Sequence, residues 1–347
     1  MSFNPTQPKL YLQINEKGDV FYNGAQISNL DVLEEFFTSF SYLENNSLVS
    51  LFHGESCHVE YFDEPLVAQK IFRSRDNFYF TITHNTPFQF QVNTLSLDEW
   101  DRFHGYTDDK IPFVLSNNAQ NDFFNLLDEY TDETITFDNK TIEVPNYWTS
   151  DTQPDNESFW TEKYKNNESK WDLGACSTVL KDNYPSLKLP ISRIAVLGGG
   201  SGHDAAFLAE QGHHVTLFDF SPSAIELAKN KYSHIANLNF VLADAFKLGA
   251  EYHRNFDIAF EHTFYCAINP TKRNDVTHLW KTLTHETGQL MGIFFAMEKR
   301  SGPPFGGSEW ELRQRLQKNW QAIKWIRSHN SDKSRWGKEF FVFARKK

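Results

Sequence analysis

The stretch VLGGGSGHDAAFLAEQGHHVTLFDF, residues 196–220, is the most informative part of the sequence about the fold. A continuous apolar run over 194–197 enters its glycines, which is typical of a strand buried on both faces of a parallel sheet. The next turn predicts a helix over about 202–211, because Gly212 stands where a helix commonly ends in a left-handed residue. A second strand is expected over 214–218.

The same alternation continues toward the end of the chain. Ser221 and Pro222 suit the N-cap and first position of another helix. Strands are expected at 238–242 and 256–260, and again in the runs GQLMGIFFAM and KEFFVFARKK. Strands that alternate with helices predict an α/β domain with a doubly wound, Rossmann-like sheet.

The first part of the chain has a different rhythm of short β-runs joined by turn residues. Pairs of runs around the turns HGES and HNTP predict hairpins, and another strand is expected over 10–14. Helices are expected from Asn29 or Asp31 and over 118–130. These signals predict a smaller antiparallel α+β domain.

A polar, loop-like stretch separates the two patterns. We therefore expect an α+β domain of unknown function over 1–148, a linker over 149–158 and the α/β domain over 159–347.

Composition excludes several classes of function. The chain has 347 residues and a net charge of −11, which disfavours nucleic acid as a partner. No run approaches the roughly 18 apolar residues of a membrane helix, and the N-terminus lacks a signal-peptide pattern. Three widely spaced cysteines argue against a disulfide framework. We expect a cytoplasmic protein that acts on a small molecule.

The glycine loop allows two cofactors. Gly198, Gly200 and Gly202 have the G-x-G-x-G spacing typical of S-adenosylmethionine (SAM) sites, whereas reading on from Gly200 to Ala205 satisfies a looser dinucleotide fingerprint. Asp219 ends the second predicted strand, where a carboxylate can hold both ribose hydroxyls of either cofactor.

Residues after the next strand favour SAM. Asp244 stands where SAM enzymes place an acid or amide beside the adenine, although it also suits a helix N-cap. Too little chain remains for the second nucleotide-binding half of a dehydrogenase. Asp204 either caps its helix or faces the sulfonium of the donor. Phe220 and Ala245 are further candidate donor contacts.

Three features of the C-terminal part resemble the thiopurine S-methyltransferase superfamily, which includes thiol, thiocyanate and halide methyltransferases. One is the segment C-A-I-N-P-x-x-R, residues 266–273, and another is G-P-P-F at 302–305. The third is Trp160 followed by Trp171-Asp172-Leu173-Gly174. The resemblance covers about 159–347 and leaves the N-terminal domain out.

The resemblance implies SAM as cofactor and an active site covered by the segment before the first strand. Trp160 and Trp171 would then contact the donor or form a lid, and Arg273 would lie near the acceptor. His262 is a candidate general base if the reaction needs one. Asp332 stands where thiopurine enzymes carry an arginine, with Arg335 directly before Trp336.

These features predict methyl transfer to a small soft nucleophile by in-line displacement. The acceptor would be a thiol, hydrosulfide, thiocyanate, halide, selenium or tellurium oxyanion, or a thiopurine. A SAM-binding sensor without turnover and an NAD-dependent oxidoreductase remain alternatives. No histidine or cysteine spacing predicts a metal site, no membrane partner is expected, and the sequence leaves the oligomeric state open.

Overall fold

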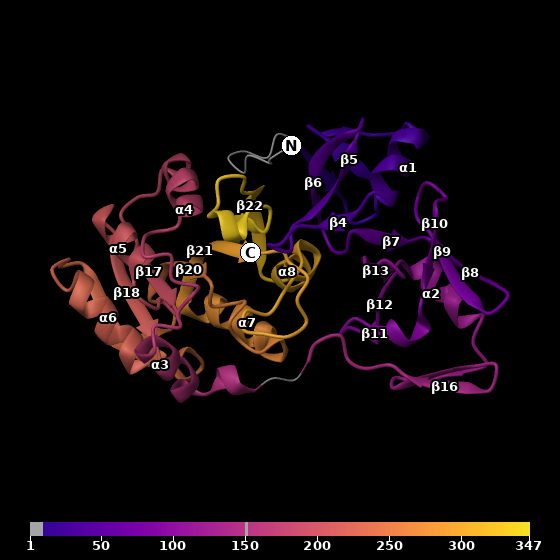
Figure 1. The fold of residues 1–347 in the computed structure, drawn as a ribbon. Coiled ribbons are helices and arrows are strands. Elements are labelled where there is room, and N and C mark those ends of the chain that lie inside the picture. The colour runs from indigo at the N-terminus through magenta and orange to yellow at the C-terminus, as the bar shows by residue number, and fades with distance from the viewer. Residues whose placement is uncertain (1–9, 150–151) are drawn as a thin grey trace. The chain divides into compact units, whose positions relative to one another are not determined.

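A computed structural model describes residues 10–149 and 152–347 (Figure 1). Contacts divide the chain into two compact units. Unit 1 contains Met1–Thr149 with Ser308–Trp310, and unit 2 contains Ser150–Gly307 with Glu311–Lys347. Residues 150 and 151 of the expected linker lie outside the described part.

Unit 1 consists of short strands with two α-helices. Its strands are β1 (Tyr11–Ile14), β2 (Val20–Tyr22), β3 (Ala25–Gln26), β4 (Ser41–Tyr42), β5 (Leu48–Phe52), β6 (Glu55–Tyr61), β7 (Leu66–Ala68), β8 (Lys70–Ser74), β9 (Asn77–Thr81), β10 (Pro87–Phe90), β11 (Ser96–Leu97), β12 (Phe103–Tyr106), β13 (Pro112–Leu115), β14 (Glu129–Tyr130), β15 (Thr134–Phe137) and β16 (Lys140–Glu143). The helices are α1 (Leu30–Thr38) and α2 (Asn117–Phe124).

The expected hairpins form, but the unit is not wholly antiparallel. β5 pairs with β6, and β9 with β10, as antiparallel neighbours. β1 also pairs in parallel with β6, and β13 with β7. The antiparallel prediction was wrong at these pairs because local turn signals reveal only strands that are adjacent in sequence.

The helices of unit 1 start where polar caps predict them. Asn29 accepts a hydrogen bond from the backbone N–H of Val32 at the start of α1. The helix expected over 118–130 ends at Phe124, however, and Glu129–Tyr130 instead forms strand β14.

Unit 2 contains one seven-stranded sheet in the order β19-β18-β17-β20-β21-β23-β22. Its strands are β17 (Arg193–Leu197), β18 (His214–Asp219), β19 (Leu238–Leu242), β20 (Phe256–His262), β21 (Thr284–Phe295), β22 (Trp320–Arg327) and β23 (Glu339–Lys346). The helices are α3 (Glu157–Lys165), α4 (Thr178–Asn183), α5 (His203–Glu210), α6 (Pro222–Tyr232), α7 (Arg273–Leu283) and α8 (Glu309–Leu316), of which α8 belongs to this unit from Glu311 on.

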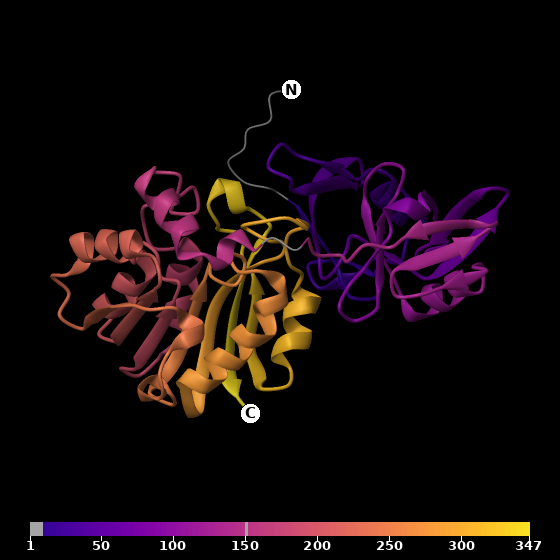
Figure 2. The same ribbon diagram turned by 90° about the horizontal axis from the view of Figure 1, so that it is seen from below.

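This sheet confirms the doubly wound α/β prediction. Its neighbours from β19 to β21 are parallel, whereas β23 is antiparallel to both β21 and β22. Helices α4, α5 and α6 pack into the core on one face, and α7 and α8 into the core on the other (Figure 2). The order of strands reverses between β17 and β20, so a crevice is expected at their carboxyl ends.

No helix in the described residues is both long and apolar enough to cross a membrane.

Candidate functional site

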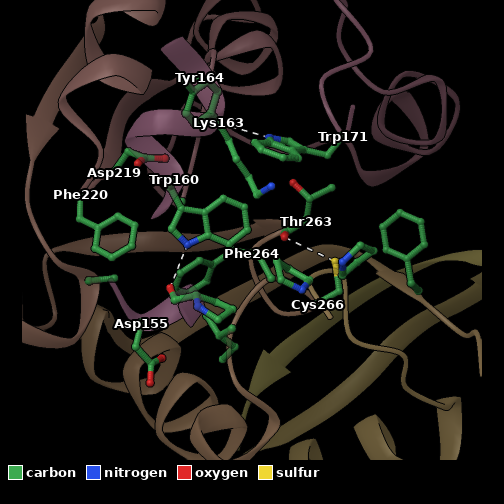
Figure 3. A pocket seen from close by; sticks show the side chains of 18 of the residues that line it. Asp155, Trp160, Lys163, Tyr164, Trp171, Asp219, Phe220, Thr263, Phe264 and Cys266 are labelled. Atoms are coloured by element: carbon green, nitrogen blue, oxygen red, sulfur yellow. Dashed lines mark hydrogen bonds between the residues drawn. The ribbon is translucent and has the colours of Figure 1, made fainter. Parts of the chain in front are cut away.

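A cavity of about 680 Å³ lies at the carboxyl ends of the parallel strands of unit 2 (Figure 3). Gly198 follows β17, Asp219 ends β18, Asp244 follows β19 and Thr263 follows β20, and all four line it. The cavity therefore occupies the topological switch point of the sheet, and its volume suits a small ligand.

The glycine loop takes a backbone conformation that side chains disfavour. Gly198, Gly200 and Gly202 have φ angles of 57°, 53° and 82°. A Cβ atom at Gly198 would also lie 2.5 Å from the Phe264 ring. Gly198 lines the cavity, whereas Gly200 and Gly202 are not among the lining residues and shape the turn.

Backbone N–H donors fix the orientation of the Asp219 carboxylate. Its Oδ2 accepts from the N–H of Gly200 and its Oδ1 from the N–H of Ser221, each at 2.9 Å. Burial raises the pKa of Asp219 to about 6, against these hydrogen bonds. Each carboxylate oxygen can accept a further hydrogen bond, so the group suits two neighbouring hydroxyls. Phe220 lines the cavity beside it.

Asp244 both caps a turn and lines the cavity. It accepts from the N–H of Phe246 at 3.0 Å and so caps the short 3₁₀ helix Ala245–Lys247. Asp244, Ala245 and Phe246 all line the cavity. The lining therefore includes a carboxylate and the aromatic rings of Phe220 and Phe246.

Trp160 and Trp171 both line the cavity from the segment before β17. Their ring centroids are 5.3 Å apart and the rings meet edge to face at 80°. Trp160 Nε1 donates to the carbonyl of Pro154 at 2.8 Å, and Trp171 Nε1 to the hydroxyl of Tyr164 at 3.2 Å. In Figure 3, Trp160 lies between Asp219 and Phe220 on one side and Thr263 and Cys266 on the other.

Toward β21 and β23, which lie beyond β20 from Asp219 in the sheet, the cavity is lined by apolar and basic side chains. Phe295, Met297 and Pro303 line it together with Arg335 and Lys338. Burial lowers the pKa of Lys338. This end is suited to a small acceptor with negative charge.

Cys266 lies at the same end as an inert thiol. Its Sγ donates to the carbonyl of Thr263 at 3.4 Å, and burial raises its pKa to about 12. It is therefore protonated near neutral pH and unsuited to act as a nucleophile.

Asp204 and His262 are brought together, but not on the cavity. Asp204 Oδ2 lies 2.6 Å from His262 Nδ1, its Oδ1 accepts from the N–H of Ser177 at 2.8 Å, and neither residue is among those that line the cavity. The prediction that Asp204 faces the donor is corrected here: its carboxylate is occupied by the histidine and the backbone.

His262 is poorly placed to act as a general base. The carboxylates of Asp204 and Glu339 raise its pKa to about 9 against its burial. Arg335 Nη1 lies 3.1 Å from Nε2, a hydrogen bond that only a neutral ring accepts. The carboxylates outweigh this interaction because Glu339 Oε1 also lies 3.1 Å from Arg335 Nη1 and offsets its charge. A ring that already carries its proton does not accept one from a substrate.

Arg273 also lies away from the cavity, and its expected place beside the acceptor is corrected. Its side chain is fully buried at the start of α7. Nη1 donates to both oxygens of Glu311, at 3.0 and 2.9 Å, and Nη2 donates to the carbonyl of Gly306. A buried guanidinium needs such partners, and the sequence carried no sign that Glu311 is one of them.

Tyr164, Lys163 and Lys338 line the cavity but were not predicted. A signal existed for Tyr164, which lies four residues after Trp160 on α3 and so shares its helix face. Lys338 is brought in by the turn before β23, which no local pattern indicates. Within the described residues, no group of three or more His, Cys, Asp or Glu side chains is arranged to hold a metal ion.

The chain is similar to several named methyltransferases. Probable thiol methyltransferase 2 of Arabidopsis thaliana is 30% identical over 148 residues, which cover 42% of this chain and 65% of that protein. Thiocyanate methyltransferase 1 of the same plant is 26% identical, covering 50% of this chain and 72% of that protein. The match thus spans less than two thirds of the first relative.

A crystal structure of Burkholderia thailandensis 1,6-didemethyltoxoflavin-N1-methyltransferase is 20% identical with a TM-score of 0.45, covering 55% of this chain and 86% of that one. Residues 155–342, more than half of the chain, match the family Thiopurine S-methyltransferase (TPMT). The chain belongs to this family.

Proposed function

We propose that unit 2 transfers a methyl group from SAM to a small soft nucleophile such as a thiol, hydrosulfide or thiocyanate. The observation that carries the proposal is Asp219, whose carboxylate is fixed by Gly200 and Ser221 on the wall of the cavity. Such a group fits the two ribose hydroxyls of SAM. The named thiol and thiocyanate methyltransferases among the relatives support the choice of acceptor.

The cavity divides between the two reactants. Asp219, Phe220 and Asp244 would hold the adenosine, and Gly198 would let the rest of the donor pass close to the backbone. Thr263, Cys266 and Met297 would surround the acceptor. When bound, SAM supplies an electrophilic methyl group, which the acceptor takes by in-line displacement.

The residues of the chain contribute position and charge. Holding two reactants in line supplies on the order of 7–11 kcal/mol of the barrier. Trp160 and Trp171 cover the cavity with apolar surface, which excludes water from the reacting atoms. Lys338 favours the anionic form of the acceptor, because its ammonium group belongs to the lining of the cavity. Thiocyanate and hydrosulfide are anions already, so they need no general base.

Calorimetric titration with S-adenosylhomocysteine, followed by product analysis, tests the proposal. We expect the wild-type protein to bind S-adenosylhomocysteine, which is what remains of SAM after methyl transfer, and not to bind NADH. SAM with a panel of thiols, hydrosulfide, thiocyanate and iodide should then give methylated product. Binding of NADH instead would favour an oxidoreductase, and binding of S-adenosylhomocysteine without any methylated product across the panel would favour a sensor.

A further inference from the structure

The segment from Trp171 to Ser177, here called the strap, lies before α4 and carries Trp171 to the cavity. None of its residues belongs to an α-helix or a strand. Its conformation therefore depends on side-chain anchors rather than on a backbone hydrogen-bond ladder.

Asp172 fastens the strap to the glycine loop. One carboxylate oxygen accepts from the hydroxyl of Ser201, and the other lies 3.0 Å from His203 Nε2. Asp172 also accepts from the N–H of Gly174 at 2.8 Å, which closes a turn within the strap. His203 Nδ1 is in turn 2.6 Å from the hydroxyl of Tyr232 on α6. Because Ser201 and His203 flank the last glycine of the loop, Asp172 couples the strap to the loop conformation.

Arg335 and Asp204 fasten the two ends of the strap. Arg335 Nη2 donates to the carbonyl of Trp171 at 2.6 Å, and Asp204 accepts from the N–H of Ser177 at 2.8 Å. Through His262 and Glu339 these anchors form one buried group of charges. The strap is thus tied at three points, to the residues that flank Gly202, to the start of α5 and to the turn before β23.

We infer that Asp172 and Arg335 are positioning residues that hold Trp171 over the donor, so that the strap and the glycine loop become ordered together. The inference rests on the proposed function. Neither residue acts on the reacting atoms through its hydrogen bonds to the strap. Loosening either anchor leaves the ribose carboxylate in place but removes the cover from the donor, which weakens donor binding more than it slows the chemical step.

Asp172→Asn tests the inference. The amide keeps the size of the side chain but removes the negative charge of the carboxylate, which His203 and Ser201 both contact. We expect the Kd of S-adenosylhomocysteine and the KM of SAM to rise about tenfold, as for the removal of one charge-assisted hydrogen bond, with kcat changed far less. Hydrogen exchange of the peptide 171–177 in the bound protein should become faster in this variant.

Asp257→Asn is the matched control. Asp257 pairs with His285 Nε2 at 2.9 Å and accepts from the backbone N–H of Arg193, but it lies at the start of β20, away from the cavity. We expect it to leave both the Kd and the strap exchange unchanged. Ser201→Ala is a milder second variant, which removes one anchor of Asp172 and should shift the Kd in the same direction.

The outcomes separate the two proposals. A wild-type protein that binds no S-adenosylhomocysteine contradicts the proposed function. A wild-type protein that binds, with Asp172→Asn and Ser201→Ala binding equally well and the strap equally protected, overturns the role of Asp172. Arg335→Lys keeps the charge but cannot reach Trp171 and Glu339 together. We expect it to raise the Kd of S-adenosylhomocysteine as Asp172→Asn does, and an unchanged Kd would contradict the positioning role of Arg335.

Discussion

The backbone N–H of Gly200 donates to Asp219 at 2.9 Å and joins the glycine turn after β17 to the end of β18. The hydrogen bond is formed with Gly200 at a φ of 53°, a conformation that glycine adopts without strain. The conformation of the glycine loop and the orientation of the Asp219 carboxylate therefore depend on each other. A change at either residue should disturb donor binding through the other.

Replacing Asp219 should remove most of the affinity for the donor. A hydrogen bond to a charged group contributes about 1.5–3 kcal/mol, so Asp219→Ala should raise the Kd of S-adenosylhomocysteine by roughly 10- to 100-fold for each ribose hydrogen bond that it removes. Calorimetry at a pH of about 7.5, where the wild-type carboxylate is ionised, measures this. A Kd within a factor of two of the wild type would show that the ribose is held elsewhere.

The affinity of the wild-type protein should also depend on pH. In the ligand-free protein, burial raises the pKa of Asp219 to about 6. The carboxylate is therefore ionised above that pH and protonated below it. The ionised form accepts both hydroxyls, so the Kd should be flat above about pH 7 and rise as the pH falls through 6, approaching tenfold per unit. Asp219→Asn serves as control because it retains any titration of the ligand itself. Parallel pH profiles for the two proteins would contradict the assignment.

Gly198 should tolerate substitution by alanine less well than Gly212, another glycine with a positive φ angle. Gly212 has a φ of 95°, and a Cβ atom there would meet nothing within 4 Å, so Gly212→Ala should cost only the backbone strain of about 1–2 kcal/mol. Gly198→Ala adds a clash with Phe264, whose ring lines the cavity. We expect both variants to lower the Tm, and only Gly198→Ala to weaken binding of S-adenosylhomocysteine. Equal affinities would show that the ring moves aside freely.

Local patterns predict the framework of unit 2 well. The apolar run of β17, the glycines after it and the polar caps of α6 each indicate their structure within a few residues, and the structure agrees. β22 was not predicted because its residues WQAIKWIR lie at the edge of the sheet, where exposed Gln321, Ala322 and Ile323 obscure the pattern of a buried strand.

Site residues could be predicted where their position depends on local sequence, and could not where it depends on residues far away in the chain. Asp219 and Gly198 lie at strand ends, which the chain order itself brings to one edge of the sheet. The surroundings of Arg273 and His262 depend on Glu311 and Asp204, which are 38 and 58 residues away in sequence. Nothing in the sequence near Arg273 or His262 distinguishes a buried ion pair from a catalytic side chain.

Arg273 should therefore matter for stability rather than for chemistry. Removing one partner of a buried ion pair costs about 3–5 kcal/mol, so Arg273→Met should lower the free energy of unfolding of unit 2 by that amount. Urea denaturation measures the decrease, and Glu311→Leu should not recover it, because Arg315 Nε also donates to Glu311 at 2.9 Å. At temperatures where the variant is folded, kcat should stay within about threefold of the wild type. A folded variant without turnover would return Arg273 to the active site.

His262 should prove dispensable as a base, and the choice of acceptor can show it. Loss of a general base typically costs roughly 10²–10⁴ in rate, but only for an acceptor that must lose a proton. His262→Asn leaves Asp204 and Arg335 in place and removes only the imidazole from the buried group of charges that anchors the strap. We expect turnover of a thiol and of thiocyanate to fall by the same small factor, below about tenfold, since both depend equally on the position of the donor. Steady-state kinetics with the two acceptors, at saturating SAM, makes the comparison within one protein. If the thiol reaction slows by about a hundredfold while the thiocyanate reaction does not, His262 takes the proton after all, and its place away from the cavity must change when substrates bind.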